Sequence, residues 1–377
     1  MAWGAATNVL KTPSVIAKEA LIALENYLVF AGLVYRAYDK EFRKVGDTIT
    51  VRKPATFTAL KFDRSSGVTV QNITEGSVAV KLDNLVDVTF ELTSEQRALD
   101  IISLSEQVIA PAMRAHAQYL DLLLAGLYVN IPYHLAMQTD TEAHKLDDMA
   151  AIEKKLNINK VPMDSRVAVL SPTGKANYIV VPSFLNAEKR GDTQALKDAN
   201  LGRIFGMDFY TDQNIVTHVK GTLSTASYYK GVISTDTLQL ATASGTQTVK
   251  KGDIIQPVSG GTFFVILEDA TITTSFATIA HYPAVDFDEA GTTVTITAVV
   301  DTAGGNNLAF HKNAFALVTA PLLAPMGGAM TAVETYKGLS CRVVYGYDMN
   351  KKVDTVSIDM LIGVKTLTEE LACRLIE

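Results

Sequence analysis

The chain has 377 residues, which is long enough to bury a large core in two or three domains. Its 48% hydrophobic and 20% charged residues are typical of a folded globular protein and exclude an intrinsically disordered chain. The net charge is −6, and the mean hydropathy of +0.16 favours some apolar surface that is covered in subunit contacts.

The charge is unevenly distributed along the chain. Residues 1–64 carry ten basic and six acidic side chains, a net +4, so the remaining residues carry −10. The basic excess lies between Arg36 and Arg64. It fits either a solvated hairpin with scattered lysines or a charged arm that meets an acidic face on a neighbouring copy. A dedicated DNA-binding domain would show a denser basic patch.

The two cysteines, Cys341 and Cys373, form neither a disulfide scaffold nor a zinc-site spacing, and they suit a reducing cytoplasm. The N-terminal sequence lacks the charged, apolar and small-residue order of a signal peptide. The apolar stretch Ala20–Tyr35 is interrupted by Glu25 and Asn26. It is too short to span a bilayer, so we expect a packed helix and no membrane partner.

The N-terminal part of the chain predicts an arm followed by a helix. Residues 1–11 have no strong pattern. Thr12 and Pro13 are typical of an N-cap and a first helical residue. We expect the helix to run from Pro13 to about Ala31, with Gly32 as its stop.

A long β-excursion is expected between two helices. Residues 45–52, 77–82 and 86–92 alternate apolar and polar side chains and are predicted strands. Residues 57–70 mix strand formers with the turn cluster at 63–67. A two-stranded ribbon is marginally stable alone in water, so this one is expected to rest on another part of the structure.

Thr93–Gln96 is a capping-box signature that predicts the start of a long helix. Apolar residues then recur at spacings of three, four and seven over about 35 residues, or roughly 50 Å. Pro111 removes a backbone donor in the middle of this pattern and predicts a kink. A second helix is expected over 146–156, with Asp147 and Asp148 as charges that cap its N-terminus.

The next segment predicts a mixed layer of strands and short helices. Residues 166–170 read as a buried strand, 171–174 as a turn, and 175–180 and 193–200 as helices. The segment Leu201–Tyr210 predicts a short helix, a glycine stop and a strand, with a polar break at 212–215.

From about His218 to Asn307 the helical periodicity disappears and Thr, Val, Ile, Gly and Ser dominate. Turn signals recur every eight to twelve residues, and four lysines against eight acids give this block a charge of −4. We interpret it as a small β-barrel or sandwich inserted into a sheet domain that resumes near Leu308. Its predicted strands cover 231–240, 253–257, 262–267 and 292–299.

No motif in the sequence predicts catalysis, a cofactor or a metal. Thr173-Gly174-Lys175 is similar to the end of a phosphate loop, but Val169 replaces the required glycine and Ala176 the magnesium-binding hydroxyl. Gly338–Arg342 lacks the second glycine of a nucleophile elbow.

The histidines and acidic runs are also predicted to be structural. None of the six histidines forms a metal pair at helical spacing; they are His116, His134, His144, His218, His281 and His311. His116 is expected at a surface or interface, and His311 in a hydrogen-bonded structural role. The acidic run Asp286–Glu289 fits no calcium loop and is read as a solvated turn.

The order of these parts, with the blocks Leu201–Ile215, Phe310–Leu322 and Ser357–Leu371, resembles the major capsid proteins of tailed double-stranded DNA bacteriophages with the HK97-type fold. This α+β fold has an N-terminal arm, an extended E-loop β-hairpin, a peripheral (P) domain with a long spine helix, and a mixed-sheet axial (A) domain. The inserted small β-barrel or sandwich resembles the arrangement in the P22 coat protein group.

The resemblance implies a division of the chain into five parts. These are an N-terminal arm and helix (1–44), the E-loop and adjoining strands (45–92), the P-domain (93–163), the A-domain (164–217 and 308–377) and the inserted β-domain (218–307). Pro111, Gly304-Gly305 and Gly327-Gly328 are candidate places for bending, or simply a static kink and ordinary turns. Some family members cross-link through lysine and asparagine, but nothing around Lys61 assigns that chemistry to it.

The implied function is a self-assembling coat protein of the virion, put together in the host cytoplasm. Its expected partners are copies of itself in hexamers and pentamers of an icosahedral shell, a scaffolding protein, a portal, and packaged double-stranded DNA bound without sequence specificity. No catalytic, cofactor-binding or metal-binding residue is carried over. Two alternatives are the shell protein of an encapsulin-like bacterial nanocompartment and a soluble enzyme with an unrecognised site.

Overall fold

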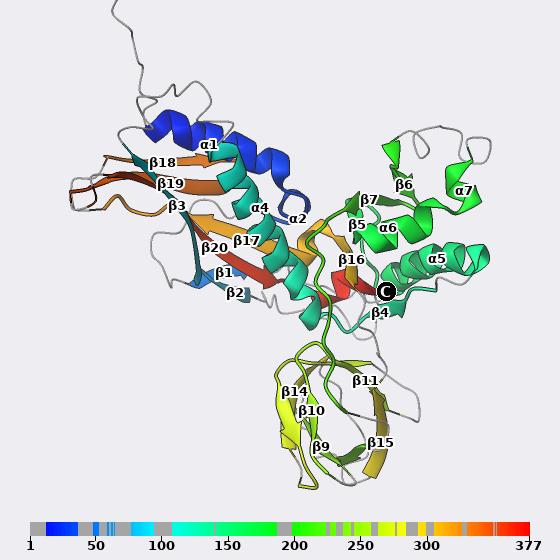
Figure 1. Cartoon of the computed structure of the whole chain (residues 1–377). Helices are drawn as coiled ribbons and strands as arrows, with labels where there is room; N and C mark the ends of the chain where they lie inside the picture. The colour runs from blue at the N-terminus through cyan, green and yellow to red at the C-terminus, as the bar shows by residue number, and fades with distance from the viewer. Residues whose placement is uncertain are drawn as a thin grey trace, which may run out of the picture. The chain divides into compact units, whose positions relative to one another are not determined.

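A computed structural model of the whole chain is drawn in Figure 1. The structure describes residues 13–36, 48–52, 59, 62, 64, 77–93, 108–138, 141–186, 198–223, 227–230, 237–242, 245–257, 263–275, 277–283, 293–298, 305–325, 330–349, 351 and 353–377. It is an α+β protein whose chain divides into two compact units. The first comprises residues 1–27, 36–117 and 316–367, and the second comprises residues 28–35, 118–315 and 368–377.

The first unit is built on an antiparallel sheet in which β20 is the longest strand. β20 (Val353–Thr366) pairs with β3 (Asn84–Thr93) and β19 (Leu339–Asp348), and β19 pairs in turn with β18 (Met330–Tyr336). β17 (Phe315–Ala320) borders β20 in the same sheet. The sequence predicted that residues 308–377 form one sheet domain with residues 164–217. That assignment is wrong for β17–β20, which belong to a different sheet from β5 and β7.

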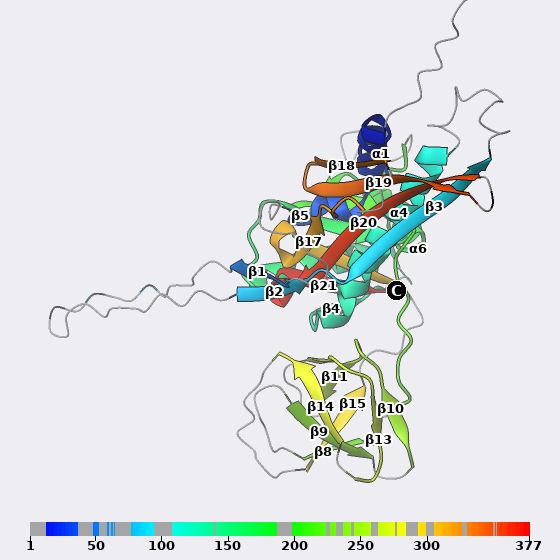
Figure 2. The same ribbon diagram turned by 90° about the vertical axis from the view of Figure 1, so that its left-hand side faces the viewer.

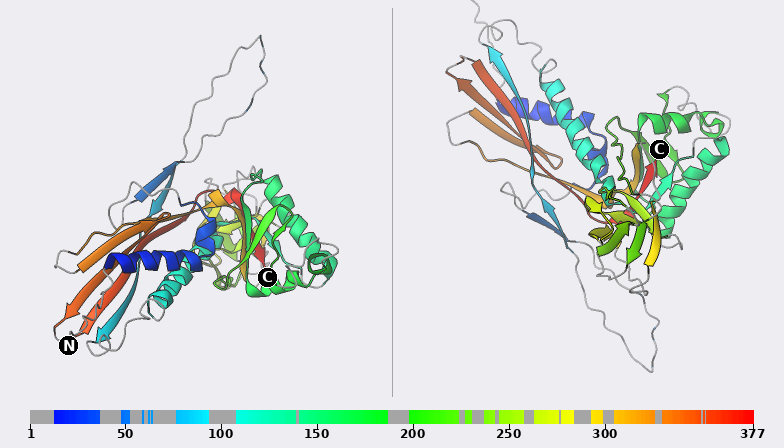
Figure 3. Two further views of the ribbon diagram at one scale, coloured as in Figure 1. Left: turned by 90° about the horizontal axis from the view of Figure 1, so that it is seen from above. Right: turned by 60° about the horizontal axis from the view of Figure 1, so that its bottom comes forward.

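Helix α1 (Pro13–Tyr27) packs across β18 and β19 (Figure 3). Its apolar residues recur at i, i+1, i+4, i+5 and i+8, which places them on one stripe of the helix. They are buried against the sheet: Ile16, Ala17, Ala20, Leu21 and Leu24. The helix ends at Tyr27 rather than near Ala31, and the short helix α2 (Phe30–Leu33) follows after a break. Gly32 therefore lies inside α2 and does not stop the first helix.

The predicted ribbon is present at its base, where β1 (Thr48–Arg52) pairs antiparallel with β2 (Ser77–Lys81). Val80 and Leu82 are fully buried in a cluster with residues of β17, β20 and the segment that follows β20: Ala316, Val318, Ala320, Leu361 and Leu367. The ribbon base thus rests on the sheet, as its marginal stability alone requires. Most of residues 57–70 lie outside the described residues.

Helix α4 covers Ala110–Ala125 and continues as a 3-10 turn, η3 (Gly126–Asn130). Pro111 is the second residue of α4, and a π-helical turn at 108–109 immediately precedes the helix. The kink expected in the middle of a longer helix depends on residues before this turn and stays a prediction. Residues 94–107, with most of the capping box, lie outside the described residues.

The second unit contains a six-stranded mixed sheet in the order β4-β21-β16-β5-β7-β6. β16 (Asn306–His311) runs antiparallel to both of its neighbours, β5 (Arg166–Leu170) and β21 (Ala372–Ile376). All residues of these three strands are buried, which is typical of a central sheet with both faces covered. The other strands are β4 (His134–Ala136), β6 (Arg203–Ile204) and β7 (Met207–Thr211).

Three helices pack in the core of this unit. They are α5 (Glu142–Ile158), α6 (Pro172–Ile179) and α7 (Pro182–Leu185). α5 begins earlier than predicted, so Asp147 and Asp148 lie inside it and do not cap its N-terminus. The carboxylate of Asp148 is buried and accepts hydrogen bonds from the backbone N–H of Gln138 (2.7 Å) and the hydroxyl of Tyr178 (3.4 Å).

Two local predictions in this unit are also corrected. Ser171 is the N-cap of α6, which already begins at Pro172, so residues 171–174 are not a turn before the helix. The expected short helix near Leu201 is instead a hairpin of β6 and β7, with Phe205 and Gly206 at positive φ in its turn. Of the helix predicted over 193–200, residues 193–197 lie outside the described residues.

Between β7 and β16 the chain forms a closed barrel in the order β11-β12-β14-β9-β8-β15 (Figures 1 and 2). A separate pair, β10 with β13, packs beside it. The strand bounds are β8 Ser227–Lys230, β9 Thr237–Thr242, β10 Gln247–Val249, β11 Ile254–Pro257, β12 Phe264–Ile266, β13 Ala270–Ile272, β14 Ala277–Tyr282 and β15 Thr293–Ala298. The chain enters and leaves this region side by side, because Thr217 bridges to Gly305.

The burial of the ribbon base yields a stability prediction. Replacing Leu82, which is fully buried, with alanine leaves a cavity and should lower the free energy of unfolding by about 2–5 kcal/mol in chemical denaturation. Leu85 is a matched control because it is the same residue type and 55% exposed. Leu85→Ala should change stability by about 0.5 kcal/mol or less. Equal losses in the two variants would contradict the packing of the ribbon on the sheet.

Candidate functional site

The sequence stretch that is similar to a phosphate loop lies at the start of α6 and is already filled by protein groups. The Ser171 hydroxyl accepts the backbone N–H of Gly174 at 2.9 Å and donates to the Glu377 carboxylate. The Asn307 amide donates to the same carboxylate oxygen at 2.9 Å. A Cβ on Gly174 would come within 2.7 Å of that oxygen. The helix start therefore holds an internal carboxylate and leaves no room for a phosphate.

The histidines are dispersed over the described residues. His116 was predicted at a surface or interface, but it is 1% exposed, and its Nε2 lies 3.1 Å from the carbonyl oxygen of Ile358. His311 accepts the backbone N–H of Asn313 at 3.2 Å, as its predicted structural role requires. In the described part of the chain no three His, Cys, Asp or Glu side chains are grouped to hold a metal ion. Asp286–Glu289 lie outside the described residues.

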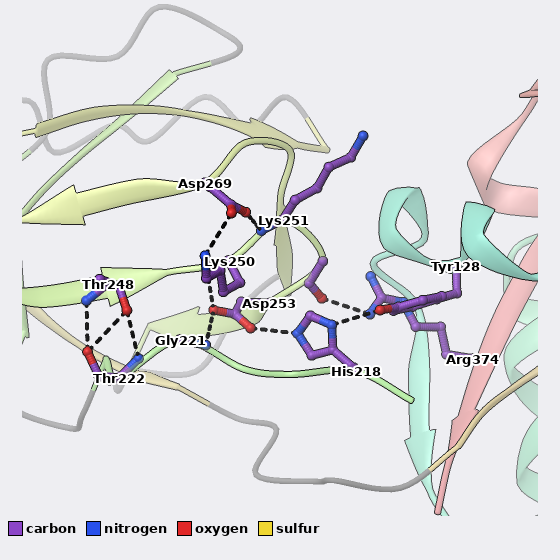
Figure 4. Close-up of polar contacts among 11 residues, drawn as sticks. Tyr128, His218, Gly221, Thr222, Thr248, Lys250, Lys251, Asp253, Asp269 and Arg374 are labelled. Carbon is purple, nitrogen blue, oxygen red and sulfur yellow. Dashed lines mark hydrogen bonds and ion pairs between the residues drawn. The ribbon is translucent and has the colours of Figure 1, made fainter. Parts of the chain in front are cut away.

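A buried polar cluster in the second unit joins the barrel to the sheet, and we call it the barrel joint. It consists of Tyr128, His218, Asp253 and Arg374 with the turn at 250–253 (Figure 4). The Tyr128 hydroxyl lies 2.9 Å from Nδ1 of His218, and Nε2 of His218 lies 2.7 Å from Oδ1 of Asp253. η3 thus supplies the tyrosine, β21 the arginine, and the start of the inserted segment the histidine.

Arg374 connects β21 to the barrel turn. Its guanidinium Nη1 donates to the carbonyl oxygen of Gly252 at 2.8 Å, and its Cζ lies 5.3 Å from the centre of the Tyr128 ring. The side chain is 1% exposed, and burial lowers the pKa of Arg374 to about 9. Its Nε and Nη2 have no hydrogen-bond partner among the described residues. The joint thus depends on one buried cation with incomplete hydrogen bonding, an arrangement that costs stability unless the geometry is kept.

The turn at 250–253 fits closely into the joint. Gly252 has φ +99°, and a Cβ there would lie 3.0 Å from Cγ1 of Val129 and 3.2 Å from Cε1 of His218. Asp253 holds the turn from inside, because its Oδ2 accepts the backbone N–H groups of Lys250 (2.8 Å) and Gly221 (3.1 Å). Only glycine meets both the backbone conformation and the close approach.

A second contact between the barrel and the sheet lies at Phe263. The Phe263 ring packs edge-on against His134 of β4, with ring centres 4.6 Å apart, and Nζ of Lys155 lies 5.5 Å from the Phe263 ring centre. Burial, together with the nearby charges of Lys155 and Arg374, lowers the pKa of His134 to about 4, against the opposing effect of its hydrogen bond to the Pro132 carbonyl. His134 is therefore neutral at pH 7. These contacts are built for packing and orientation, and they bring no nucleophile and base together at an open surface.

The sequence did not predict the barrel joint. Tyr128 and His218 are 90 residues apart, and Arg374 and Gly252 are 122 residues apart. No local spacing relates them. The one available signal was Lys250-Lys251-Gly252-Asp253, which is typical of a tight turn with an aspartate that caps its backbone.

No protein-family model matches the sequence, and no curated protein matches it. Several solved structures do match the fold of this chain. A chain of Mycobacterium phage Che8 is 14% identical with a TM-score of 0.53, and the match covers 92% of this chain and 90% of that chain. The capsid of Cyanophage P-SCSP1u (TM-score 0.49, 11% identity, 92% and 91% covered) and the mature capsid of bacteriophage PhiM1 (0.47, 9%, 91% and 86%) score lower.

Of these three scores, the Che8 value alone exceeds 0.5. This chain therefore shares its overall fold with the Che8 phage chain over nearly the whole length of both. Among the described residues, no helix is long and apolar enough to cross a membrane.

The fit of Gly252 gives a testable consequence. Gly252→Ala should lower the free energy of unfolding by about 1–3 kcal/mol, because the added methyl group meets Val129 and His218 in a left-handed conformation. Gly245→Ala is the matched control, since Gly245 has φ +76° and no atom within 4 Å of its Cβ position. The control should show the cost of the backbone conformation alone. The close approach of the barrel joint is refuted if thermal melts place both variants at the same stability.

The pKa of His134 predicts a pH dependence. The folded pKa of about 4 is below the ordinary value of 6.5, so the unfolded chain binds the proton first as the pH falls. The associated stability is present above pH 6.5, and about 3 kcal/mol is lost between pH 6.5 and pH 4. His134→Gln should remove this contribution in the difference between wild-type and variant denaturation curves. Parallel curves for the two proteins would contradict the burial of a neutral His134.

Proposed function

We propose that this chain is the major capsid protein of a tailed double-stranded DNA bacteriophage, with an HK97-type fold. The observation that carries the proposal is the fold shared with a chain of Mycobacterium phage Che8 over 92% of this chain and 90% of that one. The resemblance to this family at the sequence blocks 201–215, 310–322 and 357–371 points to the same function.

Each described element is assigned to one part of the proposed capsid fold. The β1–β2 ribbon is the base of the E-loop (45–92), α4 belongs to the spine of the P-domain (93–163), and the sheet around β16 is the A-domain core (164–217 with 308–377, less β17–β20). α1 is the helix of the part made up of the N-terminal arm and helix (1–44). The barrel between β7 and β16 is the inserted β-domain (218–307), placed as in the P22 coat protein group.

In a shell subunit, buried polar groups are needed to connect parts of the chain and are not needed to bind a substrate. The buried clusters at the start of α6 and at the barrel joint connect segments that are far apart in sequence. The ribbon base is anchored by apolar packing on the sheet. Such a chain gains its remaining stability from neighbouring copies, and obligate interfaces of this kind bury on the order of 2,000–5,000 Å².

The proposed partners are copies of the chain in hexamers and pentamers, an internal scaffolding protein, a portal, and DNA on the inner face bound without sequence specificity. Assembly would take place in the host cytoplasm and the product would be the virion shell. The net charge of −6 argues against a strong nucleic-acid-binding role, which fits enclosure of DNA better than its recognition.

The test is assembly of the purified protein. Wild-type chain, expressed with its scaffolding protein, should give closed shells in negative-stain images, whereas a variant lacking residues 56–77 should keep its fold by circular dichroism and form no closed shells. A variant in which a Gly-Ser linker of equal length replaces these residues separates the loss of loop contacts from the shortening of the chain. Normal shells from the deletion variant would contradict the E-loop assignment, and a wild-type chain that stays monomeric under all assembly conditions would contradict the function.

A further inference from the structure

The break between α1 and α2 lies where the chain passes from the first compact unit to the second, at Tyr27 and Leu28. The apolar pattern of the sequence continues through this point and predicts one helix. Leu28 and Val29 belong to neither helix, and Val29 is half-buried with φ −105° and ψ −70°. The described structure therefore interrupts a helix that local sequence favours, and a contact from elsewhere in the fold must stabilise the interruption.

That contact is the carboxylate of Asp121 on α4. Its Oδ2 accepts the backbone N–H of Val29 at 3.0 Å, and its Oδ1 accepts the backbone N–H of Ala31 at 3.2 Å. These are donors that the start of α2 leaves without an intrahelical partner. Asp121 is 2% exposed, so both oxygens are removed from water.

The surroundings of Asp121 provide no positive charge among the described residues. Phe30 of α2 stacks on Phe310 of β16 with ring centres 6.0 Å apart, and Phe310 packs edge-on against Phe315 of β17. Among the described residues, the charged group that acts on Asp121 is Asp212, which follows β7 and is 3% exposed. Its Oδ1 accepts the backbone N–H of Asn214, and its Oδ2 has no hydrogen-bond partner among the described residues.

We propose that Asp121 makes the α1–α2 break a proton-controlled latch, which stays closed when Asp121 is protonated and opens more often when Asp121 is ionised. In the closed state an ionised Asp121 is removed from bulk water, has no cation among the described residues, and is acted on by the charge of Asp212, so that backbone N–H groups alone offset its charge there. Opening the break lets water reach the carboxylate. The ionised form therefore gains more from opening than the neutral form does.

The acid–base balance of the closed state agrees with this geometry. Burial, together with the charge of Asp212, raises the pKa of Asp121 from an ordinary value of 3.8 to about 7, against the lowering effect of the backbone N–H groups of residues 29–31. By linkage, the opening constant should rise about tenfold per pH unit between roughly pH 4 and pH 7 and level off above pH 7. Acidification keeps the latch closed.

Hydrogen exchange of the full chain tests the proposal at the amides of Val29 and Ala31. After correction for the intrinsic pH dependence of exchange, the opening constant should increase about fiftyfold between pH 5 and pH 7 in the wild type. Asp121→Asn keeps the shape and one acceptor but cannot titrate, so its opening constant should be independent of pH. Asp148→Asn is the matched control, because Asp148 is also a buried helical aspartate that accepts a backbone N–H, and it should leave the wild-type slope unchanged.

Two results would overturn the latch. One is a corrected opening constant at Val29 and Ala31 that does not depend on pH in the wild type, and the other is a slope that persists in Asp121→Asn. The wild-type protein also allows a test that needs no variant at this position. The carboxyl carbon of Asp121, followed by NMR during a pH titration, should report ionisation near neutral pH, and a midpoint near pH 4 would refute the proposal.

Discussion

The pairing of β16 with β5 on one side and β21 on the other is the constraint on which the second unit depends. β16 is the first segment after the inserted barrel, and its buried backbone groups find their partners in strands that lie before the insertion and at the end of the described chain. Residues 306–311 must return from the barrel in register with residues 166–169. The Thr217–Gly305 bridge meets this requirement, because it brings both ends of the insertion together next to β16.

The barrel joint connects this same sheet to the barrel through polar side chains. β21 carries Arg374 from the sheet to Gly252 of the barrel turn, and η3 carries Tyr128 to His218. The sheet and the barrel thus share buried hydrogen bonds as well as a chain crossing. Polar groups placed in this way have few alternative partners, so they specify one arrangement of the joined parts more than they add to stability.

Much of the fold could be predicted from the sequence because its signals are local. The strands at 166–170, 77–82 and 86–92 follow from alternating or continuous apolar patterns, and the Thr- and Val-rich block from His218 onward indicates a β region. The errors arise where distant residues override local preference. Asp121 divides the first predicted helix from 90 residues away, and the burial of Asp148 depends on Gln138 and Tyr178. The barrel joint was not predictable, because its members have no common spacing.

The closed form of the barrel has a consequence for variation within this protein. A sheet that ends in an open strand exposes unpaired N–H and C=O groups to other chains, whereas a closed barrel has no such edge. The six barrel strands therefore add a compact body to the second unit without an open edge in the barrel itself. Changes of length in the connections between those strands leave the ladder of hydrogen bonds intact. The barrel is therefore a place in this chain where changes of loop length disturb little of the surrounding structure.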